Sequence, residues 1–276
     1  MGIMDFFKPL TAWSTEQVRA LLREKKPDEY NLVDVRQAGE YQREHLPGAR
    51  HIPLGELEAR REELPRNLPT LVYCDDGIRS RSGARTLVRA NFPEVAIMEG
   101  GLDAWKGAVS TGEPELKMLY FVSADGPGEL IGLAWRLEKG AESFYRGLAG
   151  ILPDRKETFT GFADAEVGHA SMLEDLYAKV APSDAQPVEA LFPEEEADAV
   201  MEGGVHVKDA IEWARQKDYP EALQLALALE ANAWDLYVTM ATESRDEQTR
   251  EIFARIAELE KGHVQQISKQ LDDALS

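Results

Sequence analysis

The chain of 276 residues contains a single cysteine, Cys74. One cysteine excludes a disulfide within the chain, a zinc ribbon and an iron site with four cysteines of the rubredoxin type. No apolar run approaches the roughly 20 residues that a membrane-spanning helix needs. The start of the chain, Met1 to Lys8, lacks the basic, apolar and small-residue segments of a secretory signal. We therefore expect a cytoplasmic protein with no membrane partner.

Positive charge is scarce as well. The chain has 31 lysines and arginines and 50 aspartates and glutamates, which gives a net charge of -19. Such a chain is a poor match for phosphate backbones, so we expect no nucleic-acid partner. The charge is uneven, with a net of -1 over residues 1–112 and -18 over residues 113–276. A shift of this size predicts a domain boundary.

The two halves also differ in their hydrophobic pattern. The first half has short β-type runs between helical stretches, at residues 31–35, 70–74 and 94–98. This alternation predicts a parallel α/β sheet. The second half has no convincing strand pattern and has helical apolar spacing near residues 128–149, 158–181, 219–242 and 246–274. We predict an α/β domain at 1–112, a linker at 113–127 and a four-helix bundle at 128–276.

Cys74 ends a strand-like run and is followed, from Ser80 to Ala90, by a helix-like stretch. A tight loop in this position can turn its backbone N–H groups inward as an anion cradle. Those donors, the helix dipole and Arg79 would stabilise a thiolate and make Cys74 a nucleophile. The alternative is that Cys74 is simply a small buried apolar residue. The predicted loop comprises Cys74, Asp75, Asp76, Gly77, Ile78, Arg79 and Ser80.

Four segments carry a family resemblance: Val33-Asp-Val-Arg36 with Glu40-Tyr41, His45-Leu-Pro-Gly-Ala-Arg-His-Ile-Pro53, the Cys74 loop, and Glu99-Gly-Gly-Leu-Asp-Ala-Trp105. In this order and spacing they resemble the rhodanese (sulfurtransferase) family. The resemblance implies that Cys74 takes a sulfane sulfur from a small-molecule donor, carries it as a persulfide and passes it to a nucleophilic acceptor. It also implies that Asp34 and Arg36 brace the loop. Related phosphatases have a loop one residue longer between Cys and Arg, which disfavours a phosphatase-like use here.

Two acidic residues of this loop leave the sulfur donor open. The charges of Asp75 and Asp76 work against a thiolate and against an anionic sulfur donor. One possibility is that their side chains point outward while their N–H groups point inward. The other is that the loop prefers a neutral persulfide to thiosulfate as its donor.

The second half has four glutamates in an unusual pattern. Glu138 and Glu230 interrupt otherwise apolar helix faces, and two Glu-x-x-His pairs follow, Glu166–His169 and Glu260–His263. Residues three apart on a helix share a face. The stretch from Glu138 to Tyr145 aligns with the stretch from Glu230 to Tyr237, and each is followed by a Glu-x-x-His helix. The second half therefore contains an internal repeat of two helices.

Four carboxylates in one bundle core would cost several kcal/mol each without compensation. Two divalent ions would offset their charge, and two neutral histidines would complete the ligand set. Oxygen-rich ligation with one imidazole per ion favours iron or manganese over a structural zinc. The alternative is a bundle with surface charges and no metal.

This doubled pattern, over residues 127–276, resembles the ferritin-like superfamily and most closely the rubrerythrin/erythrin group. The resemblance implies two iron ions, with manganese or a mixed pair as alternatives, held by Glu138, Glu166, His169, Glu230, Glu260 and His263. It implies reduction of peroxide or oxygen, a homodimer and, because rubredoxin cysteines are absent, an external electron donor. Alternatively, the bundle is an iron-binding, sensing or dimerisation module that regulates the sulfurtransferase.

Three further expectations concern the bundle. Tyr145 and Tyr237 lie two helical turns from Glu138 and Glu230, and they either hydrogen-bond the ligand carboxylates or bond elsewhere. Ala233 occupies the position where rubrerythrins often carry an additional carboxylate. Residues 182–218 read as the long crossover between the second and third core helices, with a short helix over Val207–Gln216.

Overall fold

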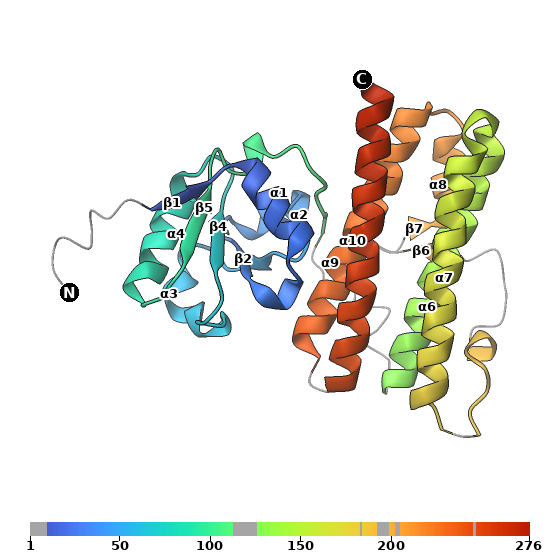
Figure 1. Cartoon of the computed structure of the whole chain (residues 1–276), viewed down its shortest axis with the longest axis horizontal. Helices are drawn as coiled ribbons and strands as arrows, with labels where there is room; N and C mark the ends of the chain where they lie inside the picture. Colours follow the sequence, from blue (N-terminus) through green and yellow to red (C-terminus); the bar gives the residue numbers. More distant parts are fainter. Residues whose placement is uncertain (1–9, 113–125, 183, 192–198, 202–204, 245–246) are drawn as a thin grey trace. The chain divides into compact units, whose positions relative to one another are not determined.

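The structure, a computed structural model, describes residues 10–112, 126–182, 184–191, 199–201, 205–244 and 247–276. The chain divides into two compact units, Met1–Glu113 and Pro114–Ser276. Figure 1 shows the elements of each unit. Of the predicted linker, residues 113–125 lie outside the described residues, as do residues 183, 192–198 and 202–204 of the predicted crossover.

The first unit is built on a five-stranded parallel sheet with the strand order β1-β5-β4-β2-β3. The predicted runs form its three inner strands, because continuous apolar stretches suit a sheet that is covered on both faces. The prediction missed two short edge strands, which offer too few residues for a pattern. The bounds are β1 Thr11–Trp13, β2 Asn31–Asp34, β3 Arg50–His51, β4 Thr70–Tyr73 and β5 Val95–Met98.

Helices cover this sheet. The α-helices are α1 Thr15–Glu24, α2 Ala38–Arg43, α3 Leu57–Arg60 and α4 Ile78–Arg89, and the 3-10 turns are η2 Pro27–Glu29, η3 Arg61–Glu63 and η4 Leu102–Ala104. Helix α4 approaches the sheet closely at Gly83, where a Cβ atom would lie 3.3 Å from side-chain carbons of Val35 and Val72. This contact fixes the start of α4, and with it the Cys74 loop, over the carboxyl ends of β2 and β4.

The second unit contains four long helices that match the predicted segments to within a few residues. They are α6 Pro127–Ile151, α7 Lys156–Val180, α9 Tyr219–Glu243 and α10 Glu247–Leu275, with the turn η6 Pro153–Arg155 between the first two. Helix α6 packs along α7, and α9 packs along α10 (Figure 1). The predicted fold class, an α/β unit followed by a ferritin-like helical bundle, is confirmed.

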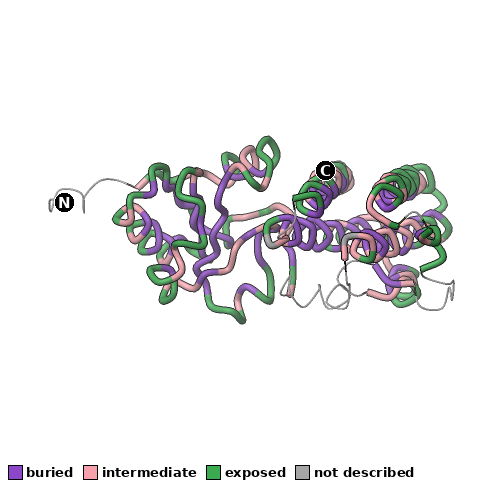
Figure 2. The backbone as a smooth tube through the Cα atoms, turned by 90° about the horizontal axis from the view of Figure 1, so that it is seen from below, coloured by how far each residue is buried: buried purple, intermediate pink, exposed green. Residues whose placement is uncertain are grey.

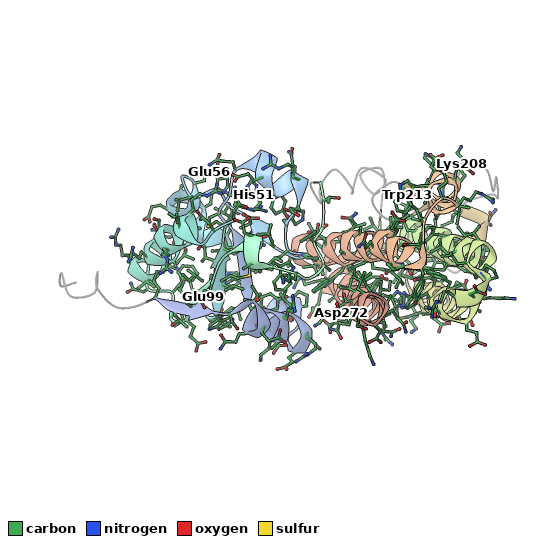
Figure 3. All side chains as sticks on the ribbon, turned by 90° about the horizontal axis from the view of Figure 1, so that it is seen from above. His51, Glu56, Glu99, Lys208, Trp213 and Asp272 are labelled. Carbon is green, nitrogen blue, oxygen red and sulfur yellow. The ribbon has the colours of Figure 1, made fainter. Side chains whose placement is uncertain are left out.

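The crossover between α7 and α9 contains helix α8 Val207–Ala214, where a short helix over Val207–Gln216 is predicted. It also holds structure that the sequence did not suggest, namely η7 Val188–Leu191 and the strands β6 Val200–Met201 and β7 Val205–His206. The two strands pair antiparallel, so the expectation of no strands in this half is wrong. Two-residue strands are too short to show alternation. The exposed side of α8 carries Lys208 and Trp213 (Figure 3).

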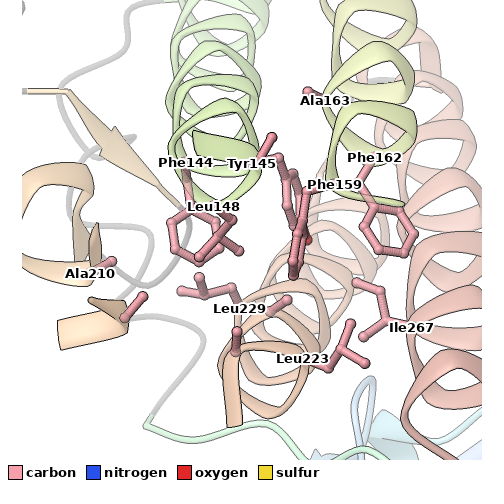
Figure 4. Close-up of a cluster of buried hydrophobic side chains, with 14 of the residues drawn as sticks. Phe144, Tyr145, Leu148, Phe159, Phe162, Ala163, Ala210, Leu223, Leu229 and Ile267 are labelled. Carbon is pink, nitrogen blue, oxygen red and sulfur yellow. The ribbon is translucent and has the colours of Figure 1, made fainter. Parts of the chain in front are cut away.

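One apolar cluster joins the crossover to the bundle (Figure 4). Phe144 and Leu148 of α6, Phe159 and Phe162 of α7 and Ile267 of α10 pack there with Ala210 of α8. Buried backbone follows the inner sides of the helices and the strands of the sheet (Figure 2). Within the described part of the chain, no helix combines the length and apolar character needed to span a bilayer.

Candidate active site and candidate metal centre

The loop after β4 wraps around the sulfur of Cys74. Cys74 is fully buried, and its Sγ accepts hydrogen bonds from the backbone N–H groups of Gly77 at 3.2 Å and Ser80 at 3.4 Å. Gly77 has a left-handed φ of 88°, which lets the chain turn into α4 directly behind the sulfur. The first helical donors therefore face Sγ, where they can stabilise a negative charge.

A second loop supports the first. The N–H groups of Leu102 and Asp103 donate to the carbonyls of Cys74 at 2.8 Å and Asp75 at 3.0 Å. A Cβ atom on Gly101 would lie 2.0 Å from the Asp75 carbonyl oxygen, so this position accommodates only glycine at that distance. The double glycine after β5 thus allows the close approach that holds the cysteine loop in place.

Alternating charges surround the loop. Arg36, which is 2% exposed, binds the carboxylate of Asp34 at 2.7 Å and that of Asp75 at 2.8 Å. Arg79 binds Asp75 at 2.8 Å and holds both oxygens of Glu40, at 2.7 and 2.8 Å. Asp75 therefore links the two arginines. The hydrogen bond from Arg79 is the main cause that holds the pKa of Glu40 well below its usual range.

Asp76 lies beside the sulfur. Its Oδ1 atom accepts a hydrogen bond from the Ile78 N–H at 2.9 Å and lies 3.6 Å from Cys74 Sγ. The bond from the Ile78 N–H is the main cause that lowers the pKa of the Asp76 carboxyl, so it is ionised at neutral pH. The two aspartates thus differ: Asp75 neutralises arginines, whereas Asp76 places a carboxylate next to the nucleophile.

In the bundle, the six residues singled out from the sequence lie in one buried cluster. Each of the four long helices contributes one glutamate, and α7 and α10 each add a histidine. The exposed fraction of every member is 6% or less; they are Glu138, Glu166, His169, Glu230, Glu260 and His263. Their ligand atoms fall into overlapping groups within 4.8 Å, compact enough to surround metal ions.

The distances give the cluster a two-fold pattern. His169 Nδ1 lies 3.1 Å from Glu138, 3.3 Å from Glu166 and 3.3 Å from Glu260. His263 Nδ1 lies 3.0 Å from Glu166, 3.2 Å from Glu230 and 3.9 Å from Glu260. Glu166 and Glu260 therefore face both imidazoles, whereas Glu138 and Glu230 each face one.

Two tyrosines cross the bundle to this cluster. Tyr145 on α6 donates a hydrogen bond to Glu230 Oε1 on α9, and Tyr237 on α9 donates to Glu138 Oε1 on α6 at 3.2 Å. Each hydroxyl thus reaches the glutamate of the other repeat. Both tyrosines are buried.

Comparisons with known proteins assign both units. A family model for the rhodanese-like domain matches residues 14–108, and the rubrerythrin family model matches residues 129–267. The chain belongs to the rubrerythrin family and carries a rhodanese-like domain. The predicted fusion is therefore confirmed.

Individual relatives match the rhodanese-like unit. The putative sulfur carrier protein YrkF of Bacillus subtilis (strain 168) is 42% identical over 77 residues, which are 28% of this chain and 42% of that protein. The thiosulfate sulfurtransferase GlpE of Coxiella burnetii (strain RSA 331 / Henzerling II) is 39% identical over 75 residues, which are 27% of this chain and 70% of that protein. The chain spans less than two thirds of YrkF.

A solved structure matches the same unit. The crystal structure of a rhodanese-like domain protein from Staphylococcus aureus is 27% identical, covers 35% of this chain and 91% of that chain, and gives a TM-score of 0.32.

The donor set of the rubrerythrin unit fits two cations. A single imidazole Nδ1 can donate one proton, yet each Nδ1 here faces oxygens of three carboxylates. Among the described residues, no hydrogen bond satisfies Glu166 Oε1 or Glu260 Oε1, because the nearby imidazole nitrogens lie outside hydrogen-bond geometry. Buried oxygens without donors, aimed at histidine nitrogens, are what a pair of metal ions would satisfy.

The pKa values of the clustered glutamates and histidines are shifted by burial and by one another. Burial raises the pKa of Glu138 to about 7 and that of Glu260 well above its usual value. Burial also opposes ionisation of Glu166, but the neighbouring imidazoles of His169 and His263 outweigh it and lower its pKa to about 2. Burial lowers the pKa of His263, yet the charges of Glu230 and Glu166 overcome it and raise this pKa to about 12. Metal ions would displace protons from these groups.

The sequence named most of these residues but missed one. Glu40 was part of the rhodanese motif without a role, and the structure pairs it with both terminal nitrogens of Arg79. Its position in the helix after β2 was the available signal, since the carboxyl ends of β2 and β4 lie side by side in a parallel sheet. The two histidines of the first unit make backbone contacts. His45 contacts the Tyr41 carbonyl at 2.8 Å, and His51 contacts the Arg36 carbonyl at 3.1 Å.

Proposed function

We propose that the rhodanese-like unit is a sulfurtransferase that carries sulfur as a persulfide on Cys74. The observation that carries this proposal is the pair of N–H groups, from Gly77 and Ser80, directed at Cys74 Sγ. The thiolate attacks the sulfane sulfur of a donor, and the same N–H groups then stabilise the persulfide until an acceptor removes the outer sulfur. The similarity to YrkF, a putative sulfur carrier protein, and to GlpE, a thiosulfate sulfurtransferase, supports sulfur carriage and transfer.

Mass spectrometry of the full chain tests this proposal. After incubation with a sulfane-sulfur donor, the wild type is expected to gain the mass of one sulfur atom on Cys74, and Cys74→Ser is expected to gain none. Ser82→Ala, an exposed position on the same helix, serves as the control that keeps the cysteine. Sulfur gained by Cys74→Ser would contradict the proposal.

We propose further that the rubrerythrin unit holds two iron ions through its six clustered ligands and acts in peroxide or oxygen reduction. When bound, a pair of ferrous ions supplies the two electrons that such a reduction needs. Glu166 and Glu260 would serve both ions, while Glu138 with His169 and Glu230 with His263 would each serve one. Tyr145 and Tyr237 fix the terminal carboxylates, and the low exposure of the cluster limits access of bulk water.

Metal analysis of freshly purified protein tests the second proposal before any assay of turnover. We expect Glu138→Ala/Glu230→Ala to lose half or more of the bound metal, since each substitution removes a terminal ligand. The matched control is Glu157→Ala/Glu251→Ala, at exposed positions on two of the same four helices. Full loading of the ligand variant would contradict the site. Reduced, iron-loaded protein should be oxidised within seconds of adding peroxide, and a slow reaction would contradict peroxide reduction.

A further inference from the structure

The mouth of the Cys74 loop carries more negative than positive charge. Around the loop, the carboxylates of Asp34, Glu40, Asp75 and Asp76 accompany the guanidinium groups of Arg36 and Arg79. Each arginine is paired with two carboxylates at 2.7–2.8 Å. A loop that binds a dianion would instead present cationic side chains that are not already paired with carboxylates.

We propose that the loop takes sulfur from an organic persulfide that reacts in its uncharged form, R–S–SH, and disfavours the inorganic dianion thiosulfate. This inference rests on the sulfur-transfer function proposed above and names the donor class of that same site. Three features of the loop carry it: the pairing of Arg79, the carboxylate of Asp76 and the exposure of Ile78.

The pairing of Arg79 removes the cation that a sulfonate group would bind. Glu40 occupies both terminal nitrogens of the guanidinium in the two-pronged geometry that a sulfonate would itself use. Asp75 takes a further position on the same group at 2.8 Å. A dianionic donor would have to displace one of these carboxylates before it gained an ion pair.

Asp76 adds a direct repulsion. Its Oδ1 atom lies 3.6 Å from the attacking sulfur, so the donor must come within a few ångströms of a full negative charge. Residue 76 is exposed, so incoming solutes meet this charge at the surface. The repulsion acts twice as strongly on a dianion as on a monoanion and does not act on a neutral donor.

Ile78 places an exposed apolar side chain in the same loop. It lies between Gly77 and Arg79 and is 69% exposed, the largest exposed fraction among the described large apolar side chains. An alkyl group on the donor would cover part of this side chain and gain a modest hydrophobic contact. An inorganic donor has no group that can do so.

The chemical step is balanced without an added oxidant. The Cys74 thiolate attacks the outer sulfur of R–S–SH, a bond forms between Sγ and that sulfur, and the S–S bond of the donor breaks. The electron pair of the broken bond leaves with R–S⁻, and the proton of the S–SH group is redistributed between that thiolate and the new persulfide. Cys74 ends as Cys74–S–SH and the donor ends as a thiol.

Single-turnover loading of the full chain tests the proposal. The donors are 2-hydroxyethyl persulfide and thiosulfate, and the readout is the rate at which Cys74 gains one sulfur atom, measured by quenching and mass spectrometry. Asp76→Asn keeps an acceptor for the Ile78 N–H but removes the charge. We expect it to raise the thiosulfate rate about tenfold and to change the persulfide rate less than about threefold.

Glu40→Gln is the second variant, because it frees Arg79 from one carboxylate. Like Asp76→Asn, it is expected to raise the loading rate from thiosulfate more than the loading rate from the persulfide. Asp28→Asn, an exposed position of the same unit away from the loop, is the control and should change neither rate. Added salt should speed loading of the wild type from thiosulfate more than from the persulfide, because salt screens the repulsion.

The outcomes separate the two proposals. If neither donor loads the wild type, sulfur transfer at Cys74 is wrong and the donor assignment falls with it. If the wild type loads faster from thiosulfate, or if both charge-removing variants leave the thiosulfate rate unchanged, only the donor assignment is overturned.

Discussion

At the scale of single residues, two tyrosines connect the two helix repeats through the candidate metal ligands. Tyr145 and Tyr237 occupy the same position in the two helix repeats, and each bonds the glutamate of the other repeat. A buried carboxylate oxygen that loses its donor is costly, so each hydroxyl fixes one orientation of a metal ligand. The sequence suggested that these hydroxyls reach carboxylates, but it could not show that they cross between repeats.

We expect Tyr145→Phe and Tyr237→Phe each to weaken iron binding about tenfold, since outer hydrogen bonds of this kind typically contribute at least that much to affinity. The measurement is competition with a chelator of known affinity. Tyr219→Phe is the control, because the Tyr219 hydroxyl bonds Gln270 at 3.1 Å outside the cluster. Unchanged affinity in both variants would show that the hydroxyls do not orient the ligands.

The pairing of Glu40 with Arg79 predicts a pH dependence. The pKa of Glu40 lies below its ordinary value of 4.5, so this pair stabilises the loop above that value and its contribution is lost as the pH falls further. Glu40→Gln should therefore speed hydrogen exchange of the loop near about pH 6 and speed it by a smaller factor near about pH 3, because the contribution declines below pH 4.5 and is lost only at the depressed pKa. Glu44→Gln, an exposed neighbour, is the control. An equal effect at both pH values would contradict the prediction.

At the scale of elements, the crossover is held against α6 by two glycines. A Cβ atom on Gly140 would lie 2.3 Å from the Val200 carbonyl oxygen, and one on Gly147 would lie 2.3 Å from Ile211 Cδ1. Glycine is usually unfavourable inside a helix, so its presence twice on one face of α6 reflects close packing of β6 and α8. The sequence showed the glycines within a helical pattern but did not show what they accommodate.

Gly140→Ala is expected to destabilise the bundle by about 1–3 kcal/mol, because the added methyl group must displace backbone rather than a flexible side chain. Gly150→Ala on the same helix meets nothing within 4 Å and is expected to be neutral or to stabilise by up to about 1 kcal/mol. Urea unfolding followed by far-UV circular dichroism compares the two. Equal stabilities would mean that β6 can move away from α6 at no cost.

At the scale of the whole molecule, the chain joins a nearly neutral unit to a strongly acidic one. The net charge of -18 over residues 113–276 includes the four buried glutamates of the cluster. Bound cations would remove part of this charge from the interior, so metal binding and stability of the bundle are linked. The homodimer remains a prediction that light scattering of the full chain can test.

Removal of metal with a chelator is expected to lower the melting temperature of the helical signal by about 10 °C, and addition of ferrous iron without oxygen should restore it. The variant Glu138→Ala/Glu230→Ala should show little or no such shift. If wild type and variant shift equally, the stabilising ions bind elsewhere.

The two units, the inner strands, the four long helices and the type and spacing of the candidate site residues could all be predicted from the amino-acid sequence. These features are local: strand and helix periods, a glycine loop behind a cysteine, and Glu-x-x-His pairs repeat over a few residues and leave a readable pattern. The folded chain was needed to show that Glu40 binds Arg79, that Asp76 lies beside the sulfur, that the tyrosines cross between repeats and that β6 packs on Gly140. These contacts depend on how separate segments pack and on the direction of each side chain, which no single stretch of sequence encodes.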